Sequence, residues 1–442
     1  MKLSVIGCGY LGAVHAAAMA SLGHQVIGID IDARRVAMLS AGEAPFFEPQ
    51  LNELLRAGIV AGRLSFSTHI DEARGADVHF LAVGTPQRRD GSAADLREVE
   101  TAVAELADVL QAGDVVVGKS TVPVGTAQRL ATTVDGAGAA LLWNPEFLRE
   151  GWAVKDTISP DRIVVGVATD ETGTPTDRAQ VAADTLRGVY TDAVDNGVPF
   201  LVTDYATSEL VKVAANAFLA TKISFINAMA EIAEVTGADV MTLADALGHD
   251  ERIGRRFLGA GVGFGGGCLP KDIRAFVARA EELGRGESVS FLRAVDEINL
   301  RRRDRAVYLV EEALGGSVFG KRITVLGAAF KPHSDDVRDS PALDVAARLH
   351  GLGATVVVTD PAAIDNARRV SPQLTYVAGR DEALRDADAV VLVTEWDEYR
   401  RQLSPEHLAT LTPGRIVVDG RNCLDPAVWR AAGFHYYGMG RP

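Results

Sequence analysis

The sequence predicts an α/β protein with two doubly wound, Rossmann-like domains joined by a long central helix and a helical region. Residues 1–30 have the pattern of a strand, a glycine-rich turn, a helix and a strand that ends in an acid. Residues 322–360 repeat the strand, the turn and the acid-terminated strand. Between them the apolar residues recur at helical spacing. We therefore expect domains at 1–203, 204–315 and 316–442.

The composition of the chain limits the kinds of partner that we expect it to bind. The 442 residues carry a net charge of −14, which argues against non-specific nucleic-acid binding. Cys8, Cys268 and Cys423 are too widely spaced for a disulfide framework or a metal site, which favours a reducing, cytoplasmic location. A strand that starts at Lys2 leaves no room for a signal peptide, and no uninterrupted apolar run reaches bilayer-spanning length, so we expect no membrane partner.

The first turn has the residues of a dinucleotide site. A buried strand at 3–6 leads into Gly7-Cys8-Gly9-Tyr10-Leu11-Gly12, and a helix to about residue 22 precedes the strand that ends in Asp30. Glycines between strand and helix, with an acid about 20 residues further on, are the fingerprint of this site. Asp30 would accept hydrogen bonds from the ribose hydroxyls, which favours NAD over NADP. Arg35 weakens that preference, because it could tolerate a 2′-phosphate.

Polar turns follow three further predicted strands, at 77–83, 114–119 and 141–143. Each turn alone is equally well explained as a surface loop. Parallel strands present their carboxyl ends at one edge, so together the turns predict a functional edge. Its residues would be Gly84, Thr85, Pro86, Thr121, Glu146 and Glu150, with one more strand at 162–166.

The central region is predicted to be helical. From about residue 205, Glu209, Lys212 and Asn216 share one face of an apolar helix. A lone lysine there is usually solvated, but Lys212 and Asn216 are one turn apart and can both donate into one pocket. The basic segment 248–256 is either a solvated face or a phosphate contact. Residues 290–314 read as an amphipathic helix with its arginines and glutamates on the outer side.

A glycine-rich loop at 263–267 runs into Cys268, and Pro270 suits the start of a helix. The helix dipole and Lys271 would favour a thiolate. Asp272 returns to the same face as the sulfur. The alternative is a buried structural cysteine. The surrounding glycines, lysine and aspartate favour a nucleophile for covalent catalysis at a carbonyl.

The C-terminal third continues as strands at 322–330, 354–360, 388–393 and 416–419. Gly327 is followed by two alanines rather than by the glycine fingerprint, so we expect no second dinucleotide there. Lys331, Arg338 and Arg421 at strand ends suit the phosphates and sugars of a nucleotide.

In this order the motifs resemble the UDP-glucose/GDP-mannose dehydrogenase family, the NAD-dependent four-electron oxidases of nucleotide sugars. The resemblance covers nearly the whole chain and is most specific at the cysteine loop. The residues 252–254 resemble the branch that acts on UDP-glucose. Small departures are Gly267 where many members have Ser, Leu269 where many have Phe, and Ser334 where Thr is usual. The motifs lie at 7–12, 120–126, 144–147, 209–216, 263–272, 331–338 and 419–421.

The resemblance implies a role for each motif. Cys268 would be the nucleophile, Asp272 an acid/base, Lys212 and Asn216 the donors to the reacting oxygen, and Thr121 and Glu146 the residues that position water and pass protons. NAD would contact Gly7, Gly9, Tyr10, Leu11, Gly12, Asp30, Arg35, Gly84, Thr85, Pro86, Thr121, Glu150, Lys271 and Arg338. The nucleotide sugar would contact Glu146, Phe147, Leu148, Arg149, Glu150, Lys212, Asn216, Arg252, Phe257, Leu258, Gly259, Ala260, Gly261, Gly265, Phe330, Lys331 and Arg421.

The resemblance also implies a homodimer or a larger homo-oligomer, in which Arg252 reaches the substrate of a neighbouring subunit. UDP-glucose is the expected substrate. Alternatives are GDP-mannose, a UDP-N-acetylhexosamine, or a catalytically silent regulator that binds a nucleotide sugar. A silent regulator would be expected to lose at least one of Cys268, Asp272, Lys212, Asn216 and Glu146, and all five are present.

Overall fold

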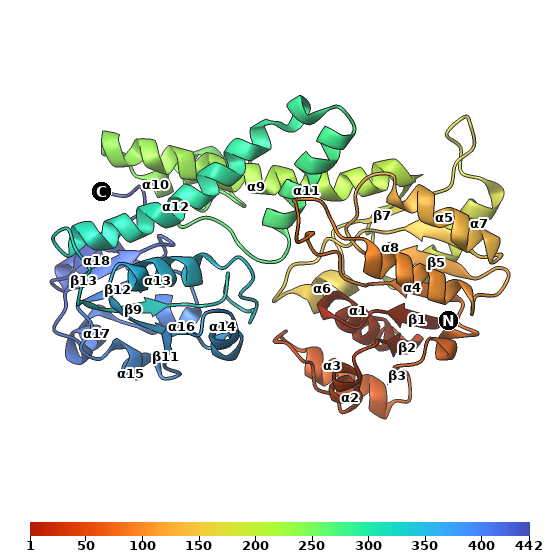
Figure 1. Cartoon of the computed structure of the whole chain (residues 1–442), viewed down its shortest axis with the longest axis horizontal. Coiled ribbons are helices and arrows are strands. Elements are labelled where there is room, and N and C mark those ends of the chain that lie inside the picture. Colours follow the sequence, from red (N-terminus) through yellow and green to blue (C-terminus); the bar gives the residue numbers. More distant parts are fainter. The chain divides into compact units, whose positions relative to one another are not determined.

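The structure is a computed structural model that describes residues 1–442 and divides into two compact units (Figure 1). The first unit comprises Met1–Ala215 and Arg274–Gly284, and the second comprises Asn216–Ile273 and Arg285–Pro442. Two helices contribute residues to both units, α9 (Tyr205–Thr236) and α11 (Leu269–Glu282).

The first unit is built on an eight-stranded sheet in the order β3-β2-β1-β4-β5-β6-β7-β8. All neighbouring strands are parallel except β6 and β7, which pair antiparallel at Trp143 and Gly166. The strands are β1 (Lys2–Ile6), β2 (Gln25–Ile29), β3 (Leu64–Ser67), β4 (Val78–Leu81), β5 (Val115–Gly118), β6 (Ala140–Trp143), β7 (Ile163–Val167) and β8 (Phe200–Asp204).

Helices cover both faces of this sheet, because alternate strand residues enter two separate cores. Val115 and Val117 of β5 belong to one apolar cluster and Val116 belongs to the other. Figure 1 shows the helices packed around the sheet. They are α1 (Tyr10–Ser21), α2 (Ala33–Ser40), α3 (Leu51–Val60), η1 (Ile70–Ala73), α4 (Arg97–Ala107), α5 (Thr126–Gly136), α6 (Ala153–Ile158), α7 (Asp177–Val189) and α8 (Thr191–Asp195).

The second unit holds a six-stranded, wholly parallel sheet in the order β11-β10-β9-β12-β13-β14. The predicted fold class is therefore confirmed, with two doubly wound sheets. The strands are β9 (Arg322–Leu326), β10 (Thr355–Thr359), β11 (Thr375–Tyr376), β12 (Ala389–Leu392), β13 (Ile416–Asp419) and β14 (His435–Gly438). The helices are α10 (Val240–Gly248), η2 (Gly286–Val289), α12 (Phe291–Ala313), α13 (Pro341–Gly351), α14 (Ile364–Val370), α15 (Arg380–Leu384), α16 (Asp397–Arg400), α17 (Pro405–Leu411) and α18 (Pro426–Ala431).

The prediction that the arginines of α12 face outward is wrong for two of them. Arg302 is fully buried, with its guanidinium 3.3 Å from a carboxylate oxygen of Glu234. Arg303 is also buried, and it lies 2.9 Å from Asp339. Buried arginines are rare unless they are paired with an acid. These two ion pairs offset the cost of removing the charged guanidinium groups from water. Helical periodicity alone did not reveal them, because the partners come from other elements.

Helix α9 is long and apolar enough, by length and composition alone, to cross a membrane. The sequence prediction overlooked it because Glu209, Lys212 and Asn216 interrupt its apolar residues. Core helices satisfy the same criterion, and these three polar side chains of α9 are buried in the structure. Their burial within the protein favours a core helix.

Candidate active site

The first glycine turn joins β1 to α1 and leaves the start of the helix open. Gly7 has a φ of +86°, which favours glycine, and a Cβ atom at Gly12 would lie 1.8 Å from the carbonyl oxygen of Gly7. Gly9 precedes the helix, no side chain caps the free N–H groups, and a Cβ atom there would meet nothing within 4 Å. Open N–H groups at a helix N-terminus fit the pyrophosphate of a dinucleotide.

Asp30 follows β2 and lies against this turn. Its Oδ2 accepts a 2.8 Å hydrogen bond from the N–H of Cys8, and its Oδ1 accepts one of 2.9 Å from the N–H of Asp32. Arg35 donates to both carboxylate oxygens. Burial raises the pKa of the Cys8 thiol, so this cysteine stays protonated. The structure thus brings Asp30 and Arg35 together beside the turn, with Arg35 bonded to both oxygens of the carboxylate.

Glu48 ties the glycine turn to the loop after β6. Tyr10 donates its hydroxyl proton to Glu48, whose other contacts are the N–H groups of Gly151, at 2.6 Å, and Ala153, at 2.8 Å. The carboxylate is buried. Sequence reasoning missed Glu48, because its segment has no regular period and its partners Gly151 and Ala153 are more than 100 residues away along the chain.

The turns after β4 and β5 are joined by hydrogen bonds. Thr85 donates to the carbonyl oxygen of Thr121 at 2.8 Å, and Ser120 donates to that of Val83 at 2.6 Å. Thr85 is buried, and Gly84 and Pro86 flank it on the same turn. The predicted edge therefore brings the two threonines together.

Glu146 lies in the loop after β6, beside a lysine that sequence reasoning did not select. Its Oε2 is 2.8 Å from the Nζ of Lys119, and its Oε1 accepts a 2.8 Å bond from the N–H of Phe147. The Nζ of Lys212 lies 5.3 Å from the centre of the Phe147 ring. Lys119 is a single charged residue at the end of the apolar strand 115–118, and this position could have identified it as a candidate site residue.

Other residues of the same loop differ in environment. Glu150 is buried. Leu148 packs against the apolar core, as Leu11 of α1 does. Arg149 instead donates hydrogen bonds to both carboxylate oxygens of Asp156 in α6, and its side chain is half exposed. The structure therefore does not group Arg149 with the glutamates.

In the second unit, Cys268 is exposed and immediately precedes α11. The N–H of Asp272 donates to the carbonyl oxygen of Cys268 at 3.0 Å. The carboxylate of Asp272 accepts from Nδ2 of Asn216 at 2.7 Å and from Nζ of Lys271 at 2.6 Å. The structure thus brings Cys268, Asp272 and Asn216 together, and the alternative of a buried structural cysteine is wrong. Lys212 lies one turn before Asn216 on α9.

The loop that precedes Cys268 is held by backbone hydrogen bonds to distant side chains. Asn299 of α12 accepts from the N–H of Phe264 at 2.7 Å and donates to its carbonyl oxygen at 3.0 Å. Arg303 donates to the same oxygen, and Arg421 donates to that of Gly263 at 2.7 Å. These contacts fix the backbone that leads to the sulfur.

The predicted nucleotide-sugar residues of the second unit surround this loop. A Cβ atom at Gly265 would lie 2.2 Å from the carbonyl oxygen of Asp339, and one at Gly266 would lie 2.7 Å from the Phe330 ring. Arg421 donates to the carbonyl oxygen of Phe330 at 3.2 Å, and the Nζ of Lys331 lies 5.3 Å from the ring centre of Phe330. Gly265 and Gly266 are therefore required by the close packing of the loop against Asp339 and Phe330.

The segment 257–261 is partly occupied by internal packing. Phe257 has a φ of +66° and an exposed ring, whereas Leu258 and Ala260 belong to an apolar core. Gly261 donates its N–H to Asn227 at 2.9 Å. A Cβ atom at Gly259 would meet nothing within 4 Å. Only Phe257 and the open backbone at Gly259 present groups to a ligand.

Two predicted arginines pair with nearby aspartates. Arg252 is almost fully exposed and donates to Asp250. Arg338 donates to Asp336, and its guanidinium carbon lies where a Cβ atom of Gly267 would be only 2.1 Å away. Arg338 therefore lies directly against the cysteine loop.

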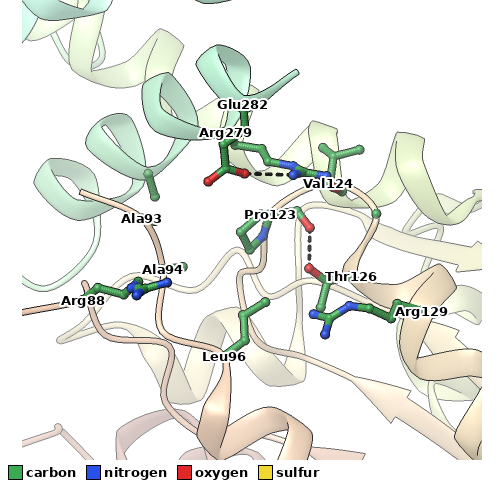
Figure 2. A pocket seen from close by; sticks show the side chains of 12 residues that line it. Arg88, Ala93, Ala94, Leu96, Pro123, Val124, Thr126, Arg129, Arg279 and Glu282 are labelled. Carbon is green, nitrogen blue, oxygen red and sulfur yellow. Dashed lines mark hydrogen bonds and ion pairs between the residues drawn. The ribbon is translucent and has the colours of Figure 1, made fainter. Parts of the chain in front are cut away.

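A pocket of about 290 Å³ lies in the first unit between the loop 123–126 and α11 (Figure 2). Arg88, Arg129 and Arg279 line it, but each already pairs with a carboxylate, as Arg279 does with Glu282 at 2.8 Å. None of the predicted site residues lines this pocket.

Comparison with known proteins gives one family for the whole chain. Three models of the UDP-glucose/GDP-mannose dehydrogenase family match, the NAD binding domain at residues 1–192, the central domain at 206–301 and the UDP binding domain at 324–426. A UDP-glucose 6-dehydrogenase of Rhizobium meliloti (strain 1021) is 40% identical over 447 residues, with 100% of both chains covered.

Solved structures agree with these matches. A UDP-glucose dehydrogenase from the hyperthermophilic archaeon Pyrobaculum islandicum has a TM-score of 0.89 and 40% identity, with 100% of this chain and 98% of that chain covered. A GDP-mannose dehydrogenase from Pseudomonas aeruginosa has a TM-score of 0.53 and 27% identity, with 99% and 100% covered.

Proposed function

The chain belongs to the UDP-glucose/GDP-mannose dehydrogenase family, and from that premise we propose that it oxidises the C6 alcohol of UDP-glucose to the carboxylate of UDP-glucuronate. It is an NAD-dependent oxidoreductase whose substrate is a nucleotide sugar. The observation that carries the proposal is the exposed Cys268 one helical turn from Asp272, which Asn216 contacts. A thiolate that adds to a carbonyl carbon and later leaves suits an oxidation that passes through an acyl intermediate.

The first glycine turn fits NAD, because its helix start is open and Asp30 lies against it. NAD, when bound, accepts the hydride of each of the two oxidations. The turn holds the pyrophosphate, and Asp30 binds the ribose hydroxyls when Arg35, whose side chain is partly exposed, moves aside. Thr85, Glu150, Lys271 and Arg338 are proposed to complete the cofactor contacts, together with Gly84, Pro86 and Thr121.

The covalent chemistry is assigned to Cys268. Its thiolate adds to the carbonyl carbon of the aldehyde, and Lys212 and Asn216 donate to the oxygen that becomes negative. After the second oxidation the carbon is held as a thioester. A water that gives its proton to Glu146 attacks this carbon, the carbon–sulfur bond breaks, and the thiolate leaves. Thr121 positions the water, and Asp272 exchanges protons with the reacting oxygen.

The nucleotide sugar is assigned to the cysteine loop and the turn after β9. Arg421 supports this site, because its guanidinium fixes the carbonyl groups of both Gly263 and Phe330. Phe257, Gly259 and Lys331 would contact the ligand directly. We further propose a cytoplasmic homodimer in which the exposed Arg252 reaches the substrate of the partner subunit.

The test is a panel of UDP-glucose, GDP-mannose and UDP-N-acetylhexosamines, read by NADH absorbance. We expect NADH from UDP-glucose, and its absence with every sugar would support a silent binding protein instead. Lys212→Ala should lower kcat by about 100-fold or more, as loss of an oxyanion donor does, without changing NAD affinity. The exposed Lys155 provides the matched control, since Lys155→Ala should leave kcat unchanged.

A further inference from the structure

Lys119 lies at the end of β5 with its ammonium group buried beside Glu146. Its side chain is 4% exposed. Three acceptors surround the Nζ atom: Oε2 of Glu146 at 2.8 Å, Oδ1 of Asn144 at 3.0 Å and the hydroxyl oxygen of Tyr190 at 3.3 Å. An ammonium group has three N–H donors and no acceptor. All three donors are therefore used within the protein, and none remains for a substrate.

The backbone reinforces this pairing. The N–H of Glu146 donates to the carbonyl oxygen of Lys119 at 3.3 Å, where β5 and β6 run side by side. Asn144 is itself fixed, because its Nδ2 donates to the carbonyl oxygen of Val164 at 2.9 Å. The Lys119 side chain thus has a single geometry, which fixes one oxygen of the Glu146 carboxylate.

The charges around the pair favour an ionised lysine. Burial works to lower the pKa of Lys119, but the carboxylate of Glu146 and the hydroxyl of Tyr190 outweigh burial, and the pKa is raised. Burial raises the pKa of Tyr190, which therefore stays neutral. Burial, followed by the charge of Lys119, holds the pKa of His15 well below its usual range. Lys119 is thus the cation that faces Glu146 among these groups.

We propose that Lys119 is a positioning residue that holds Glu146 by an ion pair and directs its carboxylate toward the water that hydrolyses the thioester. The inference rests on the proposed function, because it concerns the final step of that reaction. Water loses a proton to Glu146 and forms the carbon–oxygen bond, while the sulfur of Cys268 leaves as the thiolate. Lys119 touches none of the reacting atoms.

The test is the pH dependence of kcat for Lys119→Met, with UDP-glucose and NAD at saturation. Loss of the ammonium group removes the positive charge beside the Glu146 carboxylate. The acid limb of the pH profile of kcat should therefore move to higher pH by about 1–2 units. At pH values below the acid limbs of both enzymes, kcat of the variant should then be lower than that of the wild type by about 10- to 100-fold, and it should recover toward high pH. Intact-mass measurement of quenched enzyme should show the acyl adduct accumulating at low pH. Lys119→Gln, which keeps two N–H donors without the charge, gives the same test if the methionine variant does not fold.

Two controls separate charge from packing. Lys119→Arg keeps the charge, so its acid limb should stay at the wild-type pH even where kcat falls. Lys155→Met removes an exposed lysine of the same unit and should change neither quantity. A loss of kcat that is equal at every pH, or no loss, would overturn the proposal. A wild-type enzyme that is inactive with UDP-glucose would instead overturn the proposed function, and this inference with it.

Discussion

The two sheets place the same kind of turn at the same point. β1 lies between β2 and β4, as β9 lies between β10 and β12. Gly7 and Gly327 both have positive φ values, +86° and +120°. Each donates its N–H at 2.8 Å to the end of the neighbouring strand, to Ile29 and to Thr359 respectively. An aspartate follows each of these strands, so the two regions share one sequence pattern.

The two aspartates differ in how far the protein itself uses their hydrogen-bond acceptor sites. Asp30 accepts from the N–H groups of Cys8 and Asp32, and its other bonds come from Arg35, whose side chain is 34% exposed. Asp360 accepts from five donors of the protein, four backbone N–H groups and the ring N–H of Trp396. A carboxylate has about four lone-pair sites. Asp360 is therefore saturated, whereas Asp30 becomes available when one arginine moves.

The helices that follow the turns show the same contrast. α1 starts directly after Gly9 without a side-chain cap, whereas α13 starts after Ser340, whose hydroxyl accepts from the N–H of Leu343. The first helix start can receive a phosphate, and the second is already capped. An acid at the end of a strand thus indicates the fold. The carboxylate oxygens and backbone N–H groups that remain free determine which ligand can bind.

The largest expected effect is on the stability of the second unit. Asp360→Asn places an amide N–H₂ against N–H donors and removes the charge that they share. We expect a loss of about 3 kcal/mol or more in the free energy of unfolding, measured by denaturant unfolding. Asp30→Asn is the matched change and should cost about 1 kcal/mol. Equal losses at the two positions would show that the contrast in hydrogen bonding has no energetic meaning.

A smaller effect is expected on cofactor affinity. Asp30→Asn should weaken NAD binding by about 10-fold, as loss of about 1.4 kcal/mol does, and should reduce discrimination against NADP. UDP binding should not change, because Asp30 lies in the other unit. Calorimetric titration of each ligand separates the two outcomes. Unchanged NAD affinity would contradict the role of Asp30.

The smallest expected effect is a difference in pH sensitivity. Burial lowers the pKa values of His15 and His79, both in the first unit, below the usual 6.5. These histidines stay neutral in the fold as the pH falls through 6.5, while the unfolded chain takes up protons. Stability is therefore complete above about pH 6.5 and decreases below it by up to about 1.4 kcal/mol per pH unit for each histidine.

Hydrogen exchange at pH 7.5 and 5.5 tests this sensitivity. Amides of the first unit should become less protected at the lower pH. Burial works to raise the pKa of Asp344 in the second unit, but the hydrogen bonds and charges of Arg348 and Arg303 outweigh burial and the pKa is lowered. The contribution of Asp344 to stability is therefore lost only below about pH 4. His15→Leu should reduce the change in the first unit. Equal loss of protection in both units would contradict the assignment.

Local patterns were sufficient to predict much of the fold. The strands around both glycine turns and the helix start after Cys268 were predicted, because the period of apolar residues and the glycines lie within a few positions of one another. Short strands were missed, such as β3 with four residues and β11 with two, because so few residues show no period. The antiparallel pairing of β6 and β7 was also missed.

The grouping of candidate site residues was predicted where these residues are close in sequence. Cys268 and Asp272 are four positions apart, and helical spacing brings them together. Glu48 and Lys119 were missed because their partners lie 103 and 25 residues away along the chain, at Gly151 and Asn144. Contacts of that range depend on the order of strands in the sheet, which spacing alone does not give.

The most direct measurement is the yield of NADH per UDP-glucose consumed, for the wild-type chain and for Cys268→Ser. A covalent route through this sulfur predicts two NADH per sugar and a charged uronic acid for the wild type. The serine variant should give fewer than two and no free acid, because its ester is not released as the thiolate is. Two NADH per sugar from the variant would contradict the assignment of the chemistry to Cys268.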